Sequence, residues 1–259
     1  MADVGPSRLW FDQVVRPRLL LIPEFTELQW TIRTELERWA DVRAYDPPGI
    51  GDEPRPGELA GLTRQILADR GFEELDRAGW GDCFIAADGW AVSVAIRMAT
   101  QRPKAVRGVA LGHAALSHRR EGERAPINAD VYAAMSQLIE NDAPAFIRYA
   151  IVQSTAGSID EEVAGRMLER IPAEDIGLGW ELLTAEESWE EGLRRLRCPA
   201  LLAKHEGCLM NTDEGFEDAV AALPNAEVVA VPKAPCTSPE FAEALRSFCL
   251  RRSADAGFG

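Results

Sequence analysis

Short apolar runs alternate along the chain with longer segments in which apolar residues recur at helical spacing. Each run is almost continuously apolar, as expected for a strand that helices cover on both faces of a sheet. The alternation therefore predicts an α/β fold with a mostly parallel sheet. The predicted strands are Leu19–Ile22, Val42–Tyr45, Cys83–Ala87, Val106–Leu111, Ala200–Ala203 and Val228–Val231.

Helical spacing between these runs predicts helices at Glu58–Asp69, Ala91–Gln101 and Asp213–Ala222. A last helix has a clear start signal, because Ser238 can cap it and Pro239 suits its first position.

The alternation stops between residues 118 and 191, where helical patterns occur without a credible strand. A helical insert between two strands of a parallel sheet is expected to form a lid over the carboxyl edge, where such sheets bind ligands. A purely structural cap is the alternative. We therefore divide the chain into a core (1–117), a helical lid insert (118–191) and the rest of the core (192–259). The predicted lid helices are Val131–Ile139, Pro144–Val152, Glu161–Ile171 and Trp180–Leu183.

The charge and composition of the chain exclude some classes of binding partner. The chain has 28 Lys and Arg against 42 Asp and Glu, a net charge of −14. Such an acidic surface repels phosphate backbones and anionic lipid, so we expect no nucleic-acid or membrane partner. No apolar run approaches the roughly 20 residues of a membrane span, and the N-terminus does not resemble a signal peptide.

The numbers of cysteines and histidines indicate the cellular compartment and whether to expect a metal site. Five irregularly spaced cysteines without a Cys-x-x-Cys pair indicate a reducing compartment, so we expect a cytoplasmic protein. Three histidines (His113, His118, His205) are too few and too scattered to predict a metal cluster, and we expect no metal and no cofactor. The expected partner is a small molecule, with a homo-oligomer left open.

Several segments form an ordered series: Arg18–Thr26, Tyr45–Gly51, Cys83–Ala91, Arg102–Gly108, Cys198–Gly207 and Ala226–Cys236. The series resembles the oxyanion loop, Asp-x-Pro-Gly-x-Gly turn, nucleophile elbow, following loop, acid-bearing strand and histidine-bearing segment of the α/β-hydrolases. This resemblance extends from about Leu19 to Leu250, with the predicted lid where that family has one. It implies the α/β-hydrolase fold, with an N-terminal hairpin that looks shortened.

The catalytic positions depart from the family pattern. The family nucleophile sits between small residues on a tight turn, about fourteen residues before the Pro of the next loop. Counting back from Pro103 reaches Gly89, which has alanine at both flanking positions of the motif. The other register, with Asp88 as the nucleophile, would put Trp90 where a small residue is needed.

Equivalent counts place Cys208 at the acid position and Cys236 at the histidine position. The resemblance thus implies an α/β-hydrolase that lacks the usual Ser-His-Asp triad. Cys208 and Cys236 could form a disulfide, hold a metal, supply a nucleophilic thiol or simply fill space.

Candidate chemistry remains around the elbow. Glu24 stands where the oxyanion loop normally has glycine, and it is either a general acid or base or an exposed loop residue. His113 is a candidate proton shuttle or a hydrogen-bonded lining residue. Asp88 is a candidate catalytic carboxylate or a buried polar residue.

The oxyanion amides implied by the resemblance belong to Trp90 and a residue near Phe25. The side chains of Phe25, Trp90 and Trp180 are expected to line an apolar cavity. Gly89, Cys208 and Cys236 complete the predicted binding site.

Three functions follow as alternatives. The first is a repurposed, non-hydrolytic enzyme of cyclase, lyase or isomerase type, acting on a small, largely apolar molecule under the lid with Asp88, Glu24 and His113 as catalytic groups. The second is a non-catalytic binding protein. The third is a hydrolase with Asp88 as nucleophile, as in dehalogenases and epoxide hydrolases.

Overall fold

The computed structural model describes most of the chain. The described residues are 16–24, 26–50, 53, 63–113, 129–142, 144–146, 148, 161–170, 189–206, 208 and 212–255. The expected hairpin before the first parallel strand, and residues 58–62 of a predicted helix, lie outside them.

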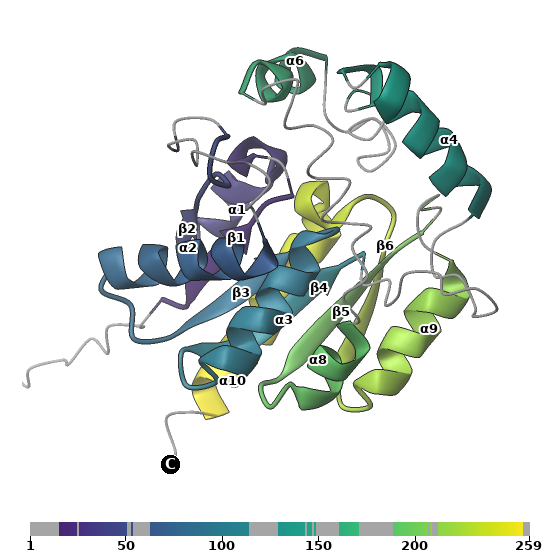
Figure 1. The fold of residues 1–259 in the computed structure, drawn as a ribbon. Helices are drawn as coiled ribbons and strands as arrows, with labels where there is room; N and C mark the ends of the chain where they lie inside the picture. Colours follow the sequence, from purple (N-terminus) through teal and green to yellow (C-terminus); the bar gives the residue numbers. More distant parts are fainter. Residues whose placement is uncertain are drawn as a thin grey trace, which may run out of the picture.

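A single parallel sheet organises the described residues (Figure 1). Its strand order is β2-β1-β3-β4-β5-β6, and every neighbouring pair is parallel. All predicted strands are confirmed, each within two residues at its ends. The strands are β1 (Arg18–Ile22), β2 (Asp41–Ala44), β3 (Cys83–Ala87), β4 (Val106–Gly112), β5 (Ala200–His205) and β6 (Glu227–Val231).

Helices cover both faces of this sheet (Figure 1). One face carries α2 (Arg64–Arg77), α3 (Ala91–Gln101), α8 (Trp189–Arg195) and α9 (Asp213–Ala222). The other carries α1 (Arg33–Leu36) and α10 (Pro239–Asp255), and two short 3-10 turns, η1 (Glu27–Gln29) and η4 (Pro235–Thr237), lie in loops. The helices α3 and α9 have the predicted bounds.

Capping side chains set two helix starts. The Thr63 hydroxyl accepts a hydrogen bond from the Ile66 amide, so α2 begins at residue 64 and runs to 77, later than the sequence pattern predicts. Ser238 accepts a hydrogen bond from the Phe241 amide at 3.2 Å, which confirms the predicted cap of α10.

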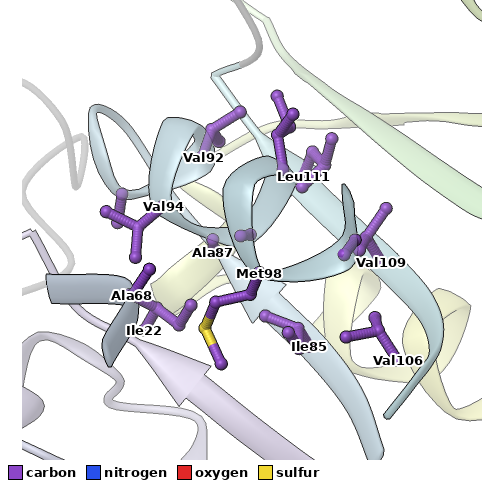
Figure 2. Close-up of a cluster of buried hydrophobic side chains, with 14 of the residues drawn as sticks. Ile22, Ala68, Ile85, Ala87, Val92, Val94, Met98, Val106, Val109 and Leu111 are labelled. Carbon is purple, nitrogen blue, oxygen red and sulfur yellow. The ribbon is translucent and has the colours of Figure 1, made fainter. Parts of the chain in front are cut away.

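Successive strand residues enter two separate cores, because side chains alternate across a sheet. Leu20 and Ile22 pack with α2 and α3, whereas Leu19 and Leu21 pack with α1 and α10. Figure 2 shows the first core, in which Met98 of α3 lies over Ile85 of β3. The two cores hold the strands in register and thereby set where their carboxyl ends meet.

Two of the predicted lid helices are described, α4 (Ala129–Asn141) and α6 (Glu161–Arg170). Both lie beyond the edge at which the strands end (Figure 1). An ion pair of 2.5 Å between Arg170 and the buried Asp46, which follows β2, joins α6 to the core. Residues 144–146 and 148 are helical, whereas Trp180–Leu183 lies outside the described residues. A lid function for this region stays a prediction.

Among the described residues, no helix combines the length and the apolar character needed to cross a membrane.

We predict that Phe248→Ala lowers the free energy of unfolding by about 3–5 kcal/mol. Phe248 is 0 % exposed, and its ring meets that of Phe84 edge-on with centroids 6.0 Å apart. Urea unfolding measures the loss. Leu250→Ala is the matched control on the same helix, where 40 % exposure should limit the change to less than about 1 kcal/mol. Equal losses in the two variants would contradict the packing described here.

Candidate active site

The turn between β3 and α3 has a glycine at its apex. Gly89 has a φ of +58°, in the left-handed region that favours glycine. A Cβ atom at this position would lie only 1.5 Å from Oε1 of Glu24. The Glu24 carboxyl group therefore fills the space into which a side chain at position 89 would project.

The Glu24 carboxyl group also occupies a backbone donor of this turn. The Trp90 amide donates a hydrogen bond of 3.0 Å to Glu24 Oε1. The loop holding Glu24 is fixed in turn, because its own amide donates to the side-chain oxygen of Gln29 at 2.7 Å. The amide that the family resemblance assigns to an oxyanion hole is thus bonded to a side chain of the protein itself.

The surroundings of Glu24 favour its protonated form. Loss of solvent is the main cause, the negative charge of Asp88 adds to it, and together they raise the pKa of Glu24 to about 8. The positive charge of His113 and the hydrogen bond from Trp90 lower the pKa only in part. At pH 7 the Glu24 side chain is therefore mostly a neutral carboxylic acid.

The buried Asp88 carboxylate accepts hydrogen bonds from three residues. It is 1 % exposed, and its Oδ1 accepts a hydrogen bond from the Gly89 amide at 3.0 Å and lies 2.5 Å from His113 Nδ1. Its Oδ2 accepts a hydrogen bond from the Cys236 amide at 3.2 Å. Burial alone would raise the pKa of Asp88, but the charge of His113 and the hydrogen bonds from His113 and Cys236 outweigh it and lower the pKa.

His113 connects the Asp88 carboxylate to the neighbouring strand β5. Its Nε2 lies 3.0 Å from Nδ1 of His205, the last residue of β5. Burial opposes the charged form of His113, yet Asp88 and Cys208 raise its pKa well above the usual value. His113 has a φ of +52°, and it is the single non-glycine residue with positive φ in the described part of the chain. Such strain persists only where surrounding contacts hold a residue in place.

A cavity of about 250 Å³ opens beside the two histidines. Its lining is more polar than the apolar cavity that the sequence indicated. The lining residues are His113, Ala203, Lys204, His205, Cys208, Thr212, Asp213 and Phe216. Six of these lining residues were not predicted for the site: Ala203, Lys204, His205, Thr212, Asp213 and Phe216. The Thr212 cap of α9 was a readable signal that this segment begins near a strand end.

His113 and His205, which are 92 residues apart in the sequence, lie side by side in space. The donor atoms of His113, His205 and Cys208 all lie within 4.8 Å of one another. The carboxyl ends of β4 and β5 bring them together, which a linear reading of three distant histidines did not predict.

The remaining predicted site residues divide into two groups. Trp90 is 3 % exposed and belongs to a hydrophobic core, so its side chain does not line the cavity as predicted. Cys236 is buried beside Asp88, and neither Cys236 nor Cys208 forms a disulfide. Phe25, Trp180 and His118 lie outside the described residues.

Comparisons with known proteins identify the fold. No protein-family model matches the chain, and no curated protein matches its sequence. Solved structures do match: a bromoperoxidase from Bacillus anthracis (TM-score 0.74, 14 % identity, 91 % of this chain and 92 % of that one) and the hydrolase olei00960 from Oleispira antarctica (0.72, 14 %, 91 % and 91 %). A thioesterase domain from the curacin biosynthetic pathway is also similar (0.69, 16 %, 91 % and 91 %).

The chain has the α/β-hydrolase fold. The fold class expected from the sequence is therefore confirmed. At sequence identities this low, the similarity shows the architecture and not an activity. In this fold Gly89 occupies the turn after the strand β3, where the sequence motif placed the nucleophile elbow.

We predict that Gly89→Ala destabilises the protein by about 1–3 kcal/mol, from backbone strain and from the clash with Glu24. Glu24→Ala removes the clash, so a double-mutant cycle in urea should give a coupling of about 0.5–3 kcal/mol. Gly165→Ala is the control, because a Cβ there meets nothing within 4 Å. Strict additivity of the two single variants would show that the Glu24 side chain lies elsewhere.

We predict that Glu24→Gln gains stability over the wild type as the pH rises. In the folded protein Glu24 keeps its proton up to a pKa of about 8, whereas in the unfolded chain it ionises near 4.5. The unfolded state therefore binds fewer protons between these values, and wild-type stability falls as the pH rises through this window. The difference between variant and wild type should grow by about 1–3 kcal/mol from pH 5 to pH 8 in urea titrations. Glu27→Gln is the control, and a parallel pH profile for Glu24→Gln and wild type would contradict the burial of Glu24.

Proposed function

We propose that this protein is an enzyme of the α/β-hydrolase fold that transfers protons instead of acyl groups. Glu24 is the proton-transferring group, and the reaction is of the lyase, isomerase or cyclase type on a small molecule. No covalent bond to the protein forms in this reaction.

One observation carries the proposal: the Glu24 carboxyl group occupies the place of a nucleophile side chain. It lies where a Cβ at residue 89 would be, and it accepts the hydrogen bond of the Trp90 amide. A hydrolytic triad needs both a nucleophile at this turn and a free amide to stabilise an oxyanion. Glycine supplies no nucleophile, and the glutamate uses the amide.

The protonation state of Glu24 suits a general acid. A carboxyl group with a pKa of about 8 holds its proton at neutral pH and can donate it, while remaining close enough to pH 7 to take it back. A neutral carboxylic acid is a poor nucleophile, which further favours proton transfer over covalent catalysis.

The contacts of Asp88 do not favour its use as a nucleophile. Both of its oxygens accept hydrogen bonds, from Gly89, His113 and Cys236, and the residue is 1 % exposed. An attacking carboxylate needs an oxygen free to reach the substrate. Asp88 instead holds His113 in a defined orientation at the wall of the cavity, so we assign it a positioning role.

The polar cavity beside His113, whose lining residues do not include Glu24, favours a small polar substrate. Lys204, Thr212 and His205 offer hydrogen bonds to a carbonyl or hydroxyl group, and Phe216 supplies an apolar surface. A volume of about 250 Å³ suits a compact molecule. We therefore propose a small carbonyl compound in place of the largely apolar molecule indicated by the sequence.

We predict that the protein exchanges hydrogen for deuterium on the carbon next to the carbonyl group of at least one small ketone, aldehyde or keto acid. Proton NMR in deuterated buffer measures this exchange across a panel of such compounds. Glu24→Gln should slow it at least about 100-fold, because general acid–base groups contribute about that factor or more. Glu27→Gln, a nearby carboxylate outside the site, should leave the rate unchanged.

Further measurements separate the proposed proton transfer from covalent catalysis and from non-catalytic binding. Turnover of p-nitrophenyl esters above background, or labelling of a serine or of Asp88 by an acylating or alkylating probe, would contradict the absence of covalent catalysis. Exchange that persists in Glu24→Gln would show that another group moves the proton. Compounds that bind without exchanging would favour the non-catalytic binding protein.

A further inference from the structure

Two imidazole nitrogens and one thiol converge at the carboxyl ends of β4 and β5. His113 Nε2 lies 3.0 Å from His205 Nδ1, and the donor atoms of His113, His205 and Cys208 lie within 4.8 Å of one another. Zinc binds nitrogen at about 2.0–2.1 Å and sulfur at about 2.3 Å, so tetrahedral ligand atoms are separated by roughly 3.3–3.6 Å. The separation of the two nitrogens is near this spacing, and small side-chain movements would bring all three donor atoms to it.

From this geometry we infer that His113, His205 and Cys208 bind a divalent transition metal, with zinc as the ion that fits best. Two nitrogens and one sulfur are borderline-soft ligands, which favour zinc over calcium or magnesium. The inference is independent of the proton transfer proposed for Glu24, because it rests on different atoms.

Asp88 supplies a second, independent observation. Histidines that bind metals commonly donate their other ring N–H to a carboxylate, which fixes the tautomer and orients the ring. The Asp88 carboxylate is 2.5 Å from His113 Nδ1, and Nε2 faces His205. A metal ion would displace the proton of Nε2, while Nδ1 would keep its proton for Asp88. Gly89 and Cys236 hold the carboxylate through their amides. The His113 ring is therefore oriented in advance for a ligand at Nε2.

The cavity gives such a metal ion an open position. All three donors belong to its lining, together with Thr212, Phe216 and the ion pair of 2.7 Å between Lys204 and Asp213. Three protein ligands plus an exchangeable fourth position distinguish catalytic zinc sites from closed structural ones. A small oxygen-containing molecule or water in the cavity would complete the coordination.

The metal-free contacts offer a competing explanation, in which Asp88, His113 and His205 form only a hydrogen-bonded chain. The two explanations differ in what Cys208 does. In the hydrogen-bonded chain Cys208 interacts with His113 through a hydrogen bond, whereas in the metal site its sulfur is a ligand.

The test is a titration of chelator-treated protein with Co²⁺ and Zn²⁺. Co²⁺ should bind with a stoichiometry of one and give the visible absorption of a tetrahedral ion together with a thiolate-to-metal charge-transfer band. Zn²⁺ should displace it and raise the midpoint of thermal unfolding, because a ligand that binds the native state stabilises it. Competition with a chromophoric chelator measures the affinity.

Variants connect the signal to the named residues. Cys208→Ser should abolish the charge-transfer band, His205→Gln should weaken binding of Zn²⁺ at least 100-fold, and Asp88→Asn should weaken it about 10–100-fold. Cys198→Ser is the matched control, because Cys198 is a free, partly exposed cysteine just before the opposite end of β5. Circular dichroism verifies that each variant is folded, and Cys208→Ala replaces Cys208→Ser if the latter is not.

Two results would overturn the inference. One is wild-type protein that binds neither ion at micromolar concentration. The other is binding that is unchanged in Cys208→Ser and His205→Gln, which would place the metal elsewhere on this acidic protein.

Discussion

The site depends on one buried carboxylate, that of Asp88. It follows directly after β3, and its hydrogen bonds join the elbow turn, the end of β4 and the short turn η4 through Gly89, His113 and Cys236. A buried charge without partners is costly, so these groups have to stay in place around it. The backbone strain at His113, with its φ of +52°, is held by the same contacts.

The Asp88 charge also affects its surroundings beyond direct contacts. It keeps His113 positively charged and, with the loss of solvent, helps to keep Glu24 neutral. Two acidic residues near one turn thus have opposite protonation states, one stabilised by a cation and the other by burial. Such pairs with separated pKa values are typical of sites that handle protons.

Glu24 and Gly89 have to be considered together. A glycine at the elbow leaves space and a free amide, and the glutamate of the neighbouring loop takes both. Glu24 then lies against Gly89 and Trp90, while His113 lies against Asp88 of the same turn.

Much of the fold was predictable from the sequence. Every strand was predictable, because buried parallel strands are continuous apolar runs. The helices α3 and α9 and the capped start of α10 were predictable as well. The bounds of α2 were predicted too early, since the helix begins after the Thr63 cap and continues to Arg77, beyond the predicted end at Asp69.

Part of the site was predictable in the same way. Asp88, Glu24 and His113 could be named because each lies at the end of a strand or in the loop that follows it. The packing of Trp90 in a hydrophobic core was not predicted, since spacing cannot say on which side of an elbow a ring packs.

The sequence by itself determined the α/β architecture and the glycine at the elbow, because both follow from local steric and apolar patterns. Only the tertiary structure decided that the Glu24 carboxyl group lies against Gly89, and that His205 and Cys208 meet His113. These contacts join residues that are far apart in the chain. They depend on the order of the strands in the sheet, which no local pattern specifies.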